Sequence, residues 1–260
     1  MEWLNGRLGL AISALRGLVV RVLRGKPMMK PVCVVVGVGP GNGAAFARRF
    51  HADGYRVALL ARSNEFTSGL AQELEGARAY ACDVADEASV ERAFAAVASE
   101  MGPVDTLIYN AGSGVWGNIE EVSARDFEQS LRVNALGAFV AAKQVVGPMK
   151  KAGRGNIVFV GATASRRGNV KTAAFAPAKA AQRSLAESMA RYLWPAGVHV
   201  AVVILDGVVD LPRTRKMMPD KPDSFFVSPA ELAESVLTLT QQKRSVWSFE
   251  LEARPFGETW

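Results

Sequence analysis

Apolar residues between positions 31 and 252 follow two alternating patterns. Short runs of consecutive apolar residues, many of them β-branched, such as "PVCVVVG", are typical of strands that are buried on both faces. Between these runs, apolar residues recur every three or four positions, as in "GAAFARRFHADG", which is the helical period. The predicted strands are residues 31–37, 56–61, 77–84, 104–110, 156–161, 198–205 and 245–252. The predicted helices are residues 43–54, 66–76, 87–102, 123–151, 172–194 and 229–242.

The order of these elements predicts the fold class. Strands that alternate with helices of this length form right-handed β-α-β units and a parallel sheet. We therefore expect an α/β fold, a Rossmann-type doubly wound parallel sheet of about seven strands with helices on both faces. No internal repeat or linker divides the pattern, so residues 28–260 are predicted to form a single domain.

Residues 1–27 differ in composition from the rest of the chain. They have apolar residues at helical spacing and five basic residues against Glu2 alone. A basic amphipathic helix of this kind can contact an anionic membrane surface or direct a protein to an organelle. The alternative is an extension outside the fold, or translated sequence upstream of the true start. The pair Met28-Met29, directly before the first strand, favours this alternative.

Charge and cysteine content limit the classes of partner. The net charge is +6, but most of it lies in residues 1–27, so the main domain has no basic footprint for nucleic acid. Cys33 and Cys82 lie in apolar runs and are expected to be reduced, buried thiols of a cytoplasmic protein. His51 and His199 do not cluster with them in the sequence, so no metal site is expected.

A glycine-rich turn, "GVGPGNG" at residues 37–43, joins the first strand to the first helix. Gly37, Gly41 and Gly43 fit the spacing G-x-x-x-G-x-G, whereas Asn42 breaks the more general G-x-G-x-x-G. Glycines let the backbone approach a pyrophosphate closely, and the following helix offers free N–H groups and a partial positive charge. The turn therefore predicts a dinucleotide-binding site.

Other short motifs follow in a set order. "CDV" ends the third predicted strand, "YNAG" ends the fourth, and Asn134 and Lys179 lie in the two later helices. With the glycine turn, they make residues 31–252 resemble the short-chain dehydrogenase/reductase family of nicotinamide enzymes. Tyr109 stands where that family has an asparagine. The resemblance implies catalytic roles for Asn134 and Lys179, and a homodimer or homotetramer built on the long helices. The expected cofactor-binding residues are Gly37, Gly41, Asn42, Gly43, Arg62, Ser63, Asp83, Val84, Asn110, Ala111, Gly112, Lys179 and Gly207.

The end of the second strand bears on the choice of cofactor. Proteins that bind NAD usually place an acidic residue there, hydrogen-bonded to the ribose hydroxyls. This chain has Ala61, Arg62 and Ser63 instead. A guanidinium can pair with the 2′-phosphate of NADP, and no carboxylate is present to repel that phosphate. We therefore expect NADP(H) to be preferred over NAD(H).

The catalytic groups that the resemblance implies are incomplete. The family has a tyrosine four residues before the lysine and a serine 13 residues before the tyrosine. Here those positions are Phe175 and Ala162, so of these three groups only Lys179 is retained. A phenylalanine has no proton to give, and a missing general acid costs roughly 10²–10⁴ in rate. The candidate substitute donors are Ser165, Thr163 if the strand has ended before it, Lys171 and Thr172, with an ordinary loop residue as the favoured alternative for each.

The segment after the sixth strand also departs from the family. Gly207 matches the glycine of a Pro-Gly pair, but Leu211 stands where a threonine is usual. Residues 210–226 occupy the position of the substrate loop. Their basic residues would favour an anionic substrate, with a solvated run of charges as the alternative. These basic residues are Arg213, Arg215 and Lys216.

The leading functional prediction is an NADP(H)-dependent oxidoreductase that acts on an unidentified carbonyl or alcohol by a non-standard proton route. The alternative is a catalytically silent NADP(H)-binding protein, either a partner subunit or a reader of redox state. A structural subunit without a nucleotide is a third interpretation, which the glycine turn disfavours.

Overall fold

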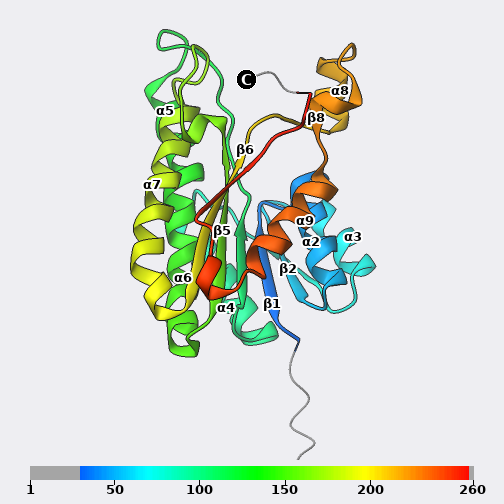
Figure 1. Cartoon of the computed structure of the whole chain (residues 1–260), viewed down its shortest axis with the longest axis vertical. Helices are drawn as coiled ribbons and strands as arrows, with labels where there is room; N and C mark the ends of the chain where they lie inside the picture. Colours follow the sequence, from blue (N-terminus) through cyan, green and yellow to red (C-terminus); the bar gives the residue numbers. More distant parts are fainter. Residues whose placement is uncertain (1–29, 258–260) are drawn as a thin grey trace, which may run out of the picture. The chain divides into compact units, whose positions relative to one another are not determined.

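The computed structural model describes residues 30–257, which contain a seven-stranded sheet with all strands parallel (Figure 1). The extension predicted over residues 1–27 lies outside the described residues. The strand order is β3-β2-β1-β4-β5-β6-β9. The strands are β1 (Val32–Val36), β2 (Arg56–Ala61), β3 (Arg78–Ala81), β4 (Thr106–Tyr109), β5 (Gly155–Ala162), β6 (Val198–Leu205) and β9 (Glu250–Ala253).

Helices cover both faces of this sheet (Figure 1). One face packs against α2 (Asn42–Ala52), α3 (Asn64–Glu73) and α9 (Pro229–Thr240). The other packs against α4 (Glu87–Met101), α6 (Gly137–Ala152) and α7 (Phe175–Leu193). The predicted doubly wound α/β fold is therefore confirmed. Within residues 30–257, no helix has both the length and the apolar character needed to cross a membrane.

The central strands show why the sequence reads as continuous apolar runs. In β1, Val34 and Val36 face the core on the α4–α6–α7 side, whereas Cys33 and Val35 face the core beneath α2 and α9. All five residues of β1 are buried. A strand covered on both faces gains from apolar side chains at every position, so the alternating pattern disappears.

The long helix predicted over residues 123–151 is interrupted. It consists of α5 (Ala124–Leu131), a π-turn over Arg132–Leu136, and α6. Gly137 N–H donates to the Arg132 carbonyl, five residues back, instead of four. The stretch predicted as one helix therefore consists of three consecutive elements.

The segment after β6 is more ordered than the predicted loop. It contains β7 (Val208–Val209), α8 (Pro212–Met217) and β8 (Phe226–Val227), and β7 pairs with β8 as a separate parallel pair. The last strand of the main sheet starts at residue 250, later than predicted, because residues 244–246 form a 3₁₀ turn.

Candidate cofactor cleft and active site

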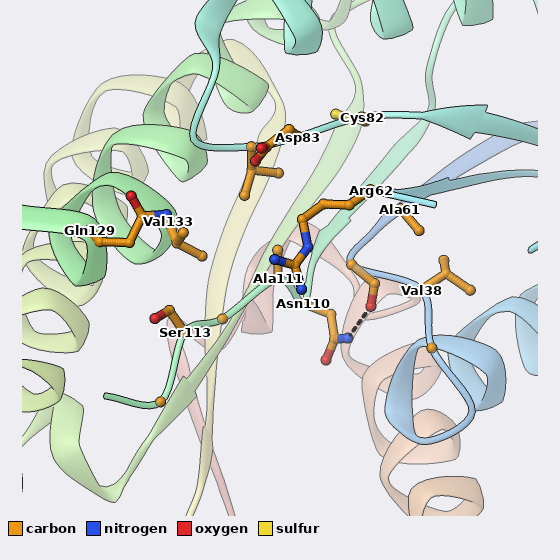
Figure 2. Close-up of a pocket in the computed structure, with 15 residues that line it drawn as sticks. Val38, Ala61, Arg62, Cys82, Asp83, Asn110, Ala111, Ser113, Gln129 and Val133 are labelled. Carbon is orange, nitrogen blue, oxygen red and sulfur yellow. Dashed lines mark hydrogen bonds between the residues drawn. The ribbon is translucent and has the colours of Figure 1, made fainter. Parts of the chain in front are cut away.

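A cavity of about 640 Å³ opens at the carboxyl ends of the central strands. The strand order reverses between β1 and β4, and ligands of doubly wound sheets bind at such a point. Figure 2 shows the lining side chains converging from the ends of β1, β2, β3 and β4. Most of the predicted cofactor-binding residues are among them, namely Gly37, Arg62, Asp83, Val84, Asn110, Ala111 and Gly112.

The first and last glycines of the turn are required by close backbone contacts. Gly37 has φ of +87°, and a β-carbon added there would lie 2.5 Å from the backbone nitrogen of Ala111. A β-carbon at Gly43 would lie 2.7 Å from the Gly37 carbonyl oxygen and 2.7 Å from the Val38 α-carbon. Asn110 Nδ2 donates to the Gly37 carbonyl at 2.7 Å and so ties the end of β4 to the turn (Figure 2).

The middle of the turn borders a second cavity of about 500 Å³, which α8 lines from the other side. Leu211 covers Gly41, since a β-carbon there would lie 2.5 Å from Leu211 Cδ2. Asn42 Oδ1 is buried and has no hydrogen-bond partner, whereas nothing lies within 4 Å of a β-carbon built on Gly39. Arg213 contributes a cation to the same cavity. The turn thus leaves open space at the N-terminus of α2, where backbone N–H groups can donate to a pyrophosphate.

The end of β2 supplies a positive charge to the main cavity. Arg62 points into the cavity (Figure 2) and, within residues 30–257, makes no ion pair or side-chain hydrogen bond. Ser63 has a local role, because its hydroxyl caps α3 by accepting from Glu65 N at 3.2 Å. At the end of β3, Asp83 Oδ1 accepts from Ala85 N at 3.0 Å.

Asn134 lies in the π-turn and is fully buried. Its Nδ2 donates to the Ser130 carbonyl at 2.9 Å and to the Ser113 carbonyl at 3.2 Å. Its Oδ1 accepts from Ser113 N at 3.4 Å. The side chain therefore fastens the loop after β4, which includes Gly112, to the interrupted helix.

Tyr109, which departs from the family motif, has a structural partner in the same π-turn. Its hydroxyl donates to the Val133 carbonyl at 2.6 Å. Burial raises the pKa of this phenol, so it stays protonated and keeps donating. Gly137 permits the close approach, since a β-carbon there would lie 2.6 Å from the Tyr109 hydroxyl.

Lys179 projects from α7 toward the inner end of the cleft, and only 4% of it is exposed. Its Nζ donates to the Val160 carbonyl at 2.8 Å and to Gln182 Oε1 at 3.2 Å. A β-carbon on Gly112, a residue of the main cavity, would lie 3.8 Å from Nζ. Burial lowers the pKa of Lys179 to about 7, so the amine can gain and lose a proton near neutral pH.

Phe175 is the first residue of α7, one turn before Lys179. The centroid of its ring lies 6.0 Å from Lys179 Nζ and 5.3 Å from the ring centroid of Trp116. Trp116 belongs to the loop after β4, which Gly117 joins by a β-bridge to the segment preceding α7. The Phe175 ring therefore lies between the Trp116 ring, which packs against it, and the amine, which lies 6.0 Å from its centroid.

The hydroxyl groups near the end of β5 are directed differently from each other. Thr163, in the 3₁₀ turn after the strand, donates to Asp206, which is also ion-paired with Arg254. Ser165 is buried, and its Oγ accepts from Ala162 N at 3.1 Å. That contact leaves the Ser165 proton free to be donated elsewhere.

Two predicted features lie apart from the cleft. Gly207 packs against the C-terminal segment, since a β-carbon there would lie 2.6 Å from Pro255 Cδ, and it lines neither cavity described above. Of the basic residues in the predicted substrate loop, Arg215 pairs with Asp210 and Asp223. This pairing matches the solvated-charge alternative for Arg215, whereas Arg213 remains at the glycine turn.

Comparisons with known proteins agree on one family. Residues 31–221 match the family model for short chain dehydrogenase. The chain is 34% identical over 227 residues to 3-oxoacyl-[acyl-carrier-protein] reductase MabA of Mycobacterium bovis, covering 84% of this chain and 89% of the relative. A solved short-chain dehydrogenase from Rhodopseudomonas palustris is similar with a TM-score of 0.75 and 33% identity, covering 87% of this chain and 99% of that one. The alcohol dehydrogenase of the archaeon Thermococcus sibiricus, solved with 5-hydroxy-NADP, is similar with a TM-score of 0.79 and 28% identity, over 88% and 98% of the two chains.

Proposed function

Since the chain belongs to the short-chain dehydrogenase family, we propose that it is an NADP(H)-dependent oxidoreductase that interconverts a carbonyl and an alcohol. The observation that carries this proposal is the continuity of one site. Gly37 and Gly39 of the glycine turn line one cavity with Arg62 and Gly112, and the Lys179 amine lies directly behind Gly112. A binding groove for a dinucleotide and an ionisable group therefore meet at the same place.

The residues present fit NADP(H). The glycine turn and the free backbone N–H groups at the N-terminus of α2, that of Asn42 among them, would hold the pyrophosphate, and Asp83 would contact the adenosine. Arg62 would pair with the 2′-phosphate, because no carboxylate at the end of β2 opposes it. The relative from Thermococcus sibiricus was solved with an NADP derivative, which supports this choice. When bound, the cofactor supplies the hydride.

The proton route is proposed to differ from that of the family. Ala162 and Phe175 are taken to occupy the positions of its serine and tyrosine, so neither can polarise or protonate a substrate oxygen. Lys179 would give the proton, since burial brings the pKa of its ammonium close to neutral, where a general acid is most effective. Ser165 is proposed as a second donor to the same oxygen, since its hydroxyl accepts from Ala162 N and keeps its own proton. Asn134, through its bonds to Ser113, would hold the loop that contains Gly112 in place beside Lys179.

The rival is a silent NADP(H)-binding protein, and a specific observation favours it. The Phe175 ring packs against Trp116, so the position of the expected acid is filled by apolar surface. On this alternative the cleft would bind NADP(H) and leave it unchanged. The rival and the enzyme share the cofactor site and differ only in turnover.

Assembly and compartment are proposed on separate grounds. Three large apolar side chains are exposed along α5, the π-turn and α6, namely Phe127, Leu136 and Phe139. Such a surface suits contact between copies of the chain, and supports a homodimer or homotetramer built on these helices. Both cysteines are free and buried, which accords with a cytoplasmic protein.

The test combines cofactor titration with a substrate screen. Purified protein is titrated with NADPH and with NADH by nicotinamide fluorescence, and NADPH oxidation is then followed with a panel of aliphatic and aromatic ketones. Tighter binding of NADPH together with turnover of a ketone is expected. Binding without turnover on any ketone would favour the rival, and failure to bind either nucleotide would refute the proposal. The same titration is run on Arg62→Ala. Its control for the loss of a positive charge is Arg191→Ala, at an arginine that is 78% exposed on α7.

A further inference from the structure

Gln182 lies on α7 next to Lys179, and none of it is exposed. Its Nε2 donates to the Asn134 carbonyl oxygen at 2.8 Å, and its Oε1 accepts from Lys179 Nζ at 3.2 Å. Both ends of one carboxamide are therefore in contact with the backbone or side chain of a candidate catalytic residue.

The buried stripe of α7 shows that this glutamine is out of place as a packing residue. Ala178, Ala186 and Ala190 lie on the same side of the helix and are buried. Burying a carboxamide among apolar residues is unfavourable unless its hydrogen bonds are made. Here the bonds are made, and they join α7 to the π-turn.

The bond from Gln182 Nε2 to the Asn134 carbonyl satisfies an acceptor of the π-turn. After the shifted bond from Gly137 to Arg132, the next two carbonyls accept side-chain donors: Val133 accepts from Tyr109, and Asn134 from Gln182. A buried carbonyl in an irregular helix needs such a donor. Gln182 thus stabilises the turn that carries Asn134 and, through the same group, contacts Lys179.

We propose that Gln182 is a positioning residue, which fixes the Lys179 amine behind Gly112 and locks it to the π-turn that carries Asn134. The role of Gln182 in catalysis rests on the proposed function. The hydrogen bond that couples Gln182 to Lys179 does not, because it is present in the protein without any ligand.

The charge and hydrogen bonding around the amine determine in which direction each substitution of Gln182 changes the pKa of Lys179. The groups that face Nζ are neutral and come from several elements: the Val160 carbonyl of β5, Gln182 and the Phe175 ring of α7, and the loop at Gly112. A hydrogen bond accepted by the Gln182 oxygen favours the charged amine. Removing that oxygen lowers the pKa of Lys179, and replacing the carboxamide by a carboxylate raises it.

Carbon-13 NMR of protein labelled at the lysine ε-carbons measures this directly in the full chain. The Lys179 signal is assigned by its loss in Lys179→Met and is followed with pH in wild type, Gln182→Met and Gln182→Glu. The midpoint is expected to rise by at least about one pH unit in Gln182→Glu, because an opposite charge within about 4–6 Å typically changes a pKa by about 1–3. It is expected to fall in Gln182→Met. The control, Gln144→Met, removes a glutamine on α6 that donates to Val140 and leaves the midpoint unchanged.

Midpoints that coincide with wild type in folded variants would overturn the proposal. A purely structural glutamine would lower the melting temperature on substitution and leave the Lys179 midpoint where it was. The wild type supplies a test that needs no variant of Gln182: its side-chain amide nitrogen signal must titrate with the same midpoint as the Lys179 carbon. An amide signal that does not follow the lysine would also refute the coupling. Since none of these measurements uses NADPH, failure of the proposed function would be seen separately, as absence of nucleotide binding.

Discussion

Replacing Lys179 by methionine should stabilise the protein at neutral pH while disabling the proposed active site. The lysine is buried and its pKa falls from 10.5 to about 7, with burial as the cause. A pKa difference of one between the folded and unfolded chain corresponds to roughly 1.4 kcal/mol. Below pH 7 the buried, charged amine therefore costs roughly 5 kcal/mol of folding free energy relative to a lysine in water. Methionine has a similar length and removes that cost.

Two hydrogen bonds oppose the gain. Lys179 Nζ donates to the Val160 carbonyl and to Gln182 Oε1, and each bond contributes about 1 kcal/mol, with a further cost for the acceptors left unpaired. The net stabilisation of Lys179→Met at pH 7 is then roughly 2 kcal/mol. For a domain of this size, that raises the melting temperature by roughly 4–8 °C.

The sign of the pH dependence follows from the two pKa values. Between about pH 7 and 10.5 the unfolded chain keeps a proton on Lys179 that the folded chain has released. The stability of the wild type consequently rises with pH through this window, and its disadvantage relative to Lys179→Met shrinks. Near pH 9.5 the remaining cost is roughly 1.4 kcal/mol, less than the lost hydrogen bonds, so the wild type should be the more stable protein.

Melting temperatures measured between about pH 6.5 and 9.5 check this crossover, within the range where pKa and unfolding are linked. Lys143→Met on α6 is the matched control, because Lys143 is exposed and its replacement removes a lysine without removing a buried amine. A difference between Lys179→Met and wild type that stays flat with pH would refute the burial of a titrating amine. So would a variant that is less stable at every pH.

Three further substitutions test other parts of the site. Arg62→Ala should weaken NADPH binding by about tenfold or more and leave NADH binding unchanged, by fluorescence titration; equal losses for both nucleotides would exclude a 2′-phosphate contact. Gly43→Ala should abolish NADPH binding or lower the melting temperature, because the new β-carbon meets backbone at 2.7 Å, whereas Gly147→Ala, which meets nothing within 4 Å, should do neither. The double variant Ala162→Ser with Phe175→Tyr should raise ketone reduction by at least roughly 10², the lower end for a general acid. Unchanged activity in a double variant that folds and binds NADPH would argue against the assignment of these two positions to the family's catalytic pair.

Much of the fold is visible in the sequence because parallel strands covered on both faces leave an unbroken apolar signature. β2 and β6 have the predicted bounds of residues 56–61 and 198–205. The glycine turn is equally readable, since the contacts at Gly37 and Gly43 exclude any side chain. A feature that depends on a few neighbouring residues, such as this turn, can be predicted from the sequence.

The parts that the sequence does not reveal depend on partners far apart in the chain. The π-turn is held by Tyr109 from β4 and Gln182 from α7, and neither residue leaves a trace in the helical period around Asn134. The position of Gln182 on the apolar stripe of α7 is the one available signal, but its two partners emerge only in the fold. Arg213 reaches the glycine turn through the β7–β8 pair, which is too short to be recognised from its sequence.

Transfer of a label from cofactor to product measures the proposed reaction most directly. Purified full-length protein is incubated with NADPH deuterated at C4 and with ketones from the panel, and the alcohol is analysed by mass spectrometry. We expect a product alcohol that carries deuterium from the cofactor and is formed at a lower rate by Lys179→Met than by wild type. Saturable NADPH binding with no deuterium in any alcohol would contradict the proposal that this protein is an oxidoreductase, and would leave it a binder of NADPH.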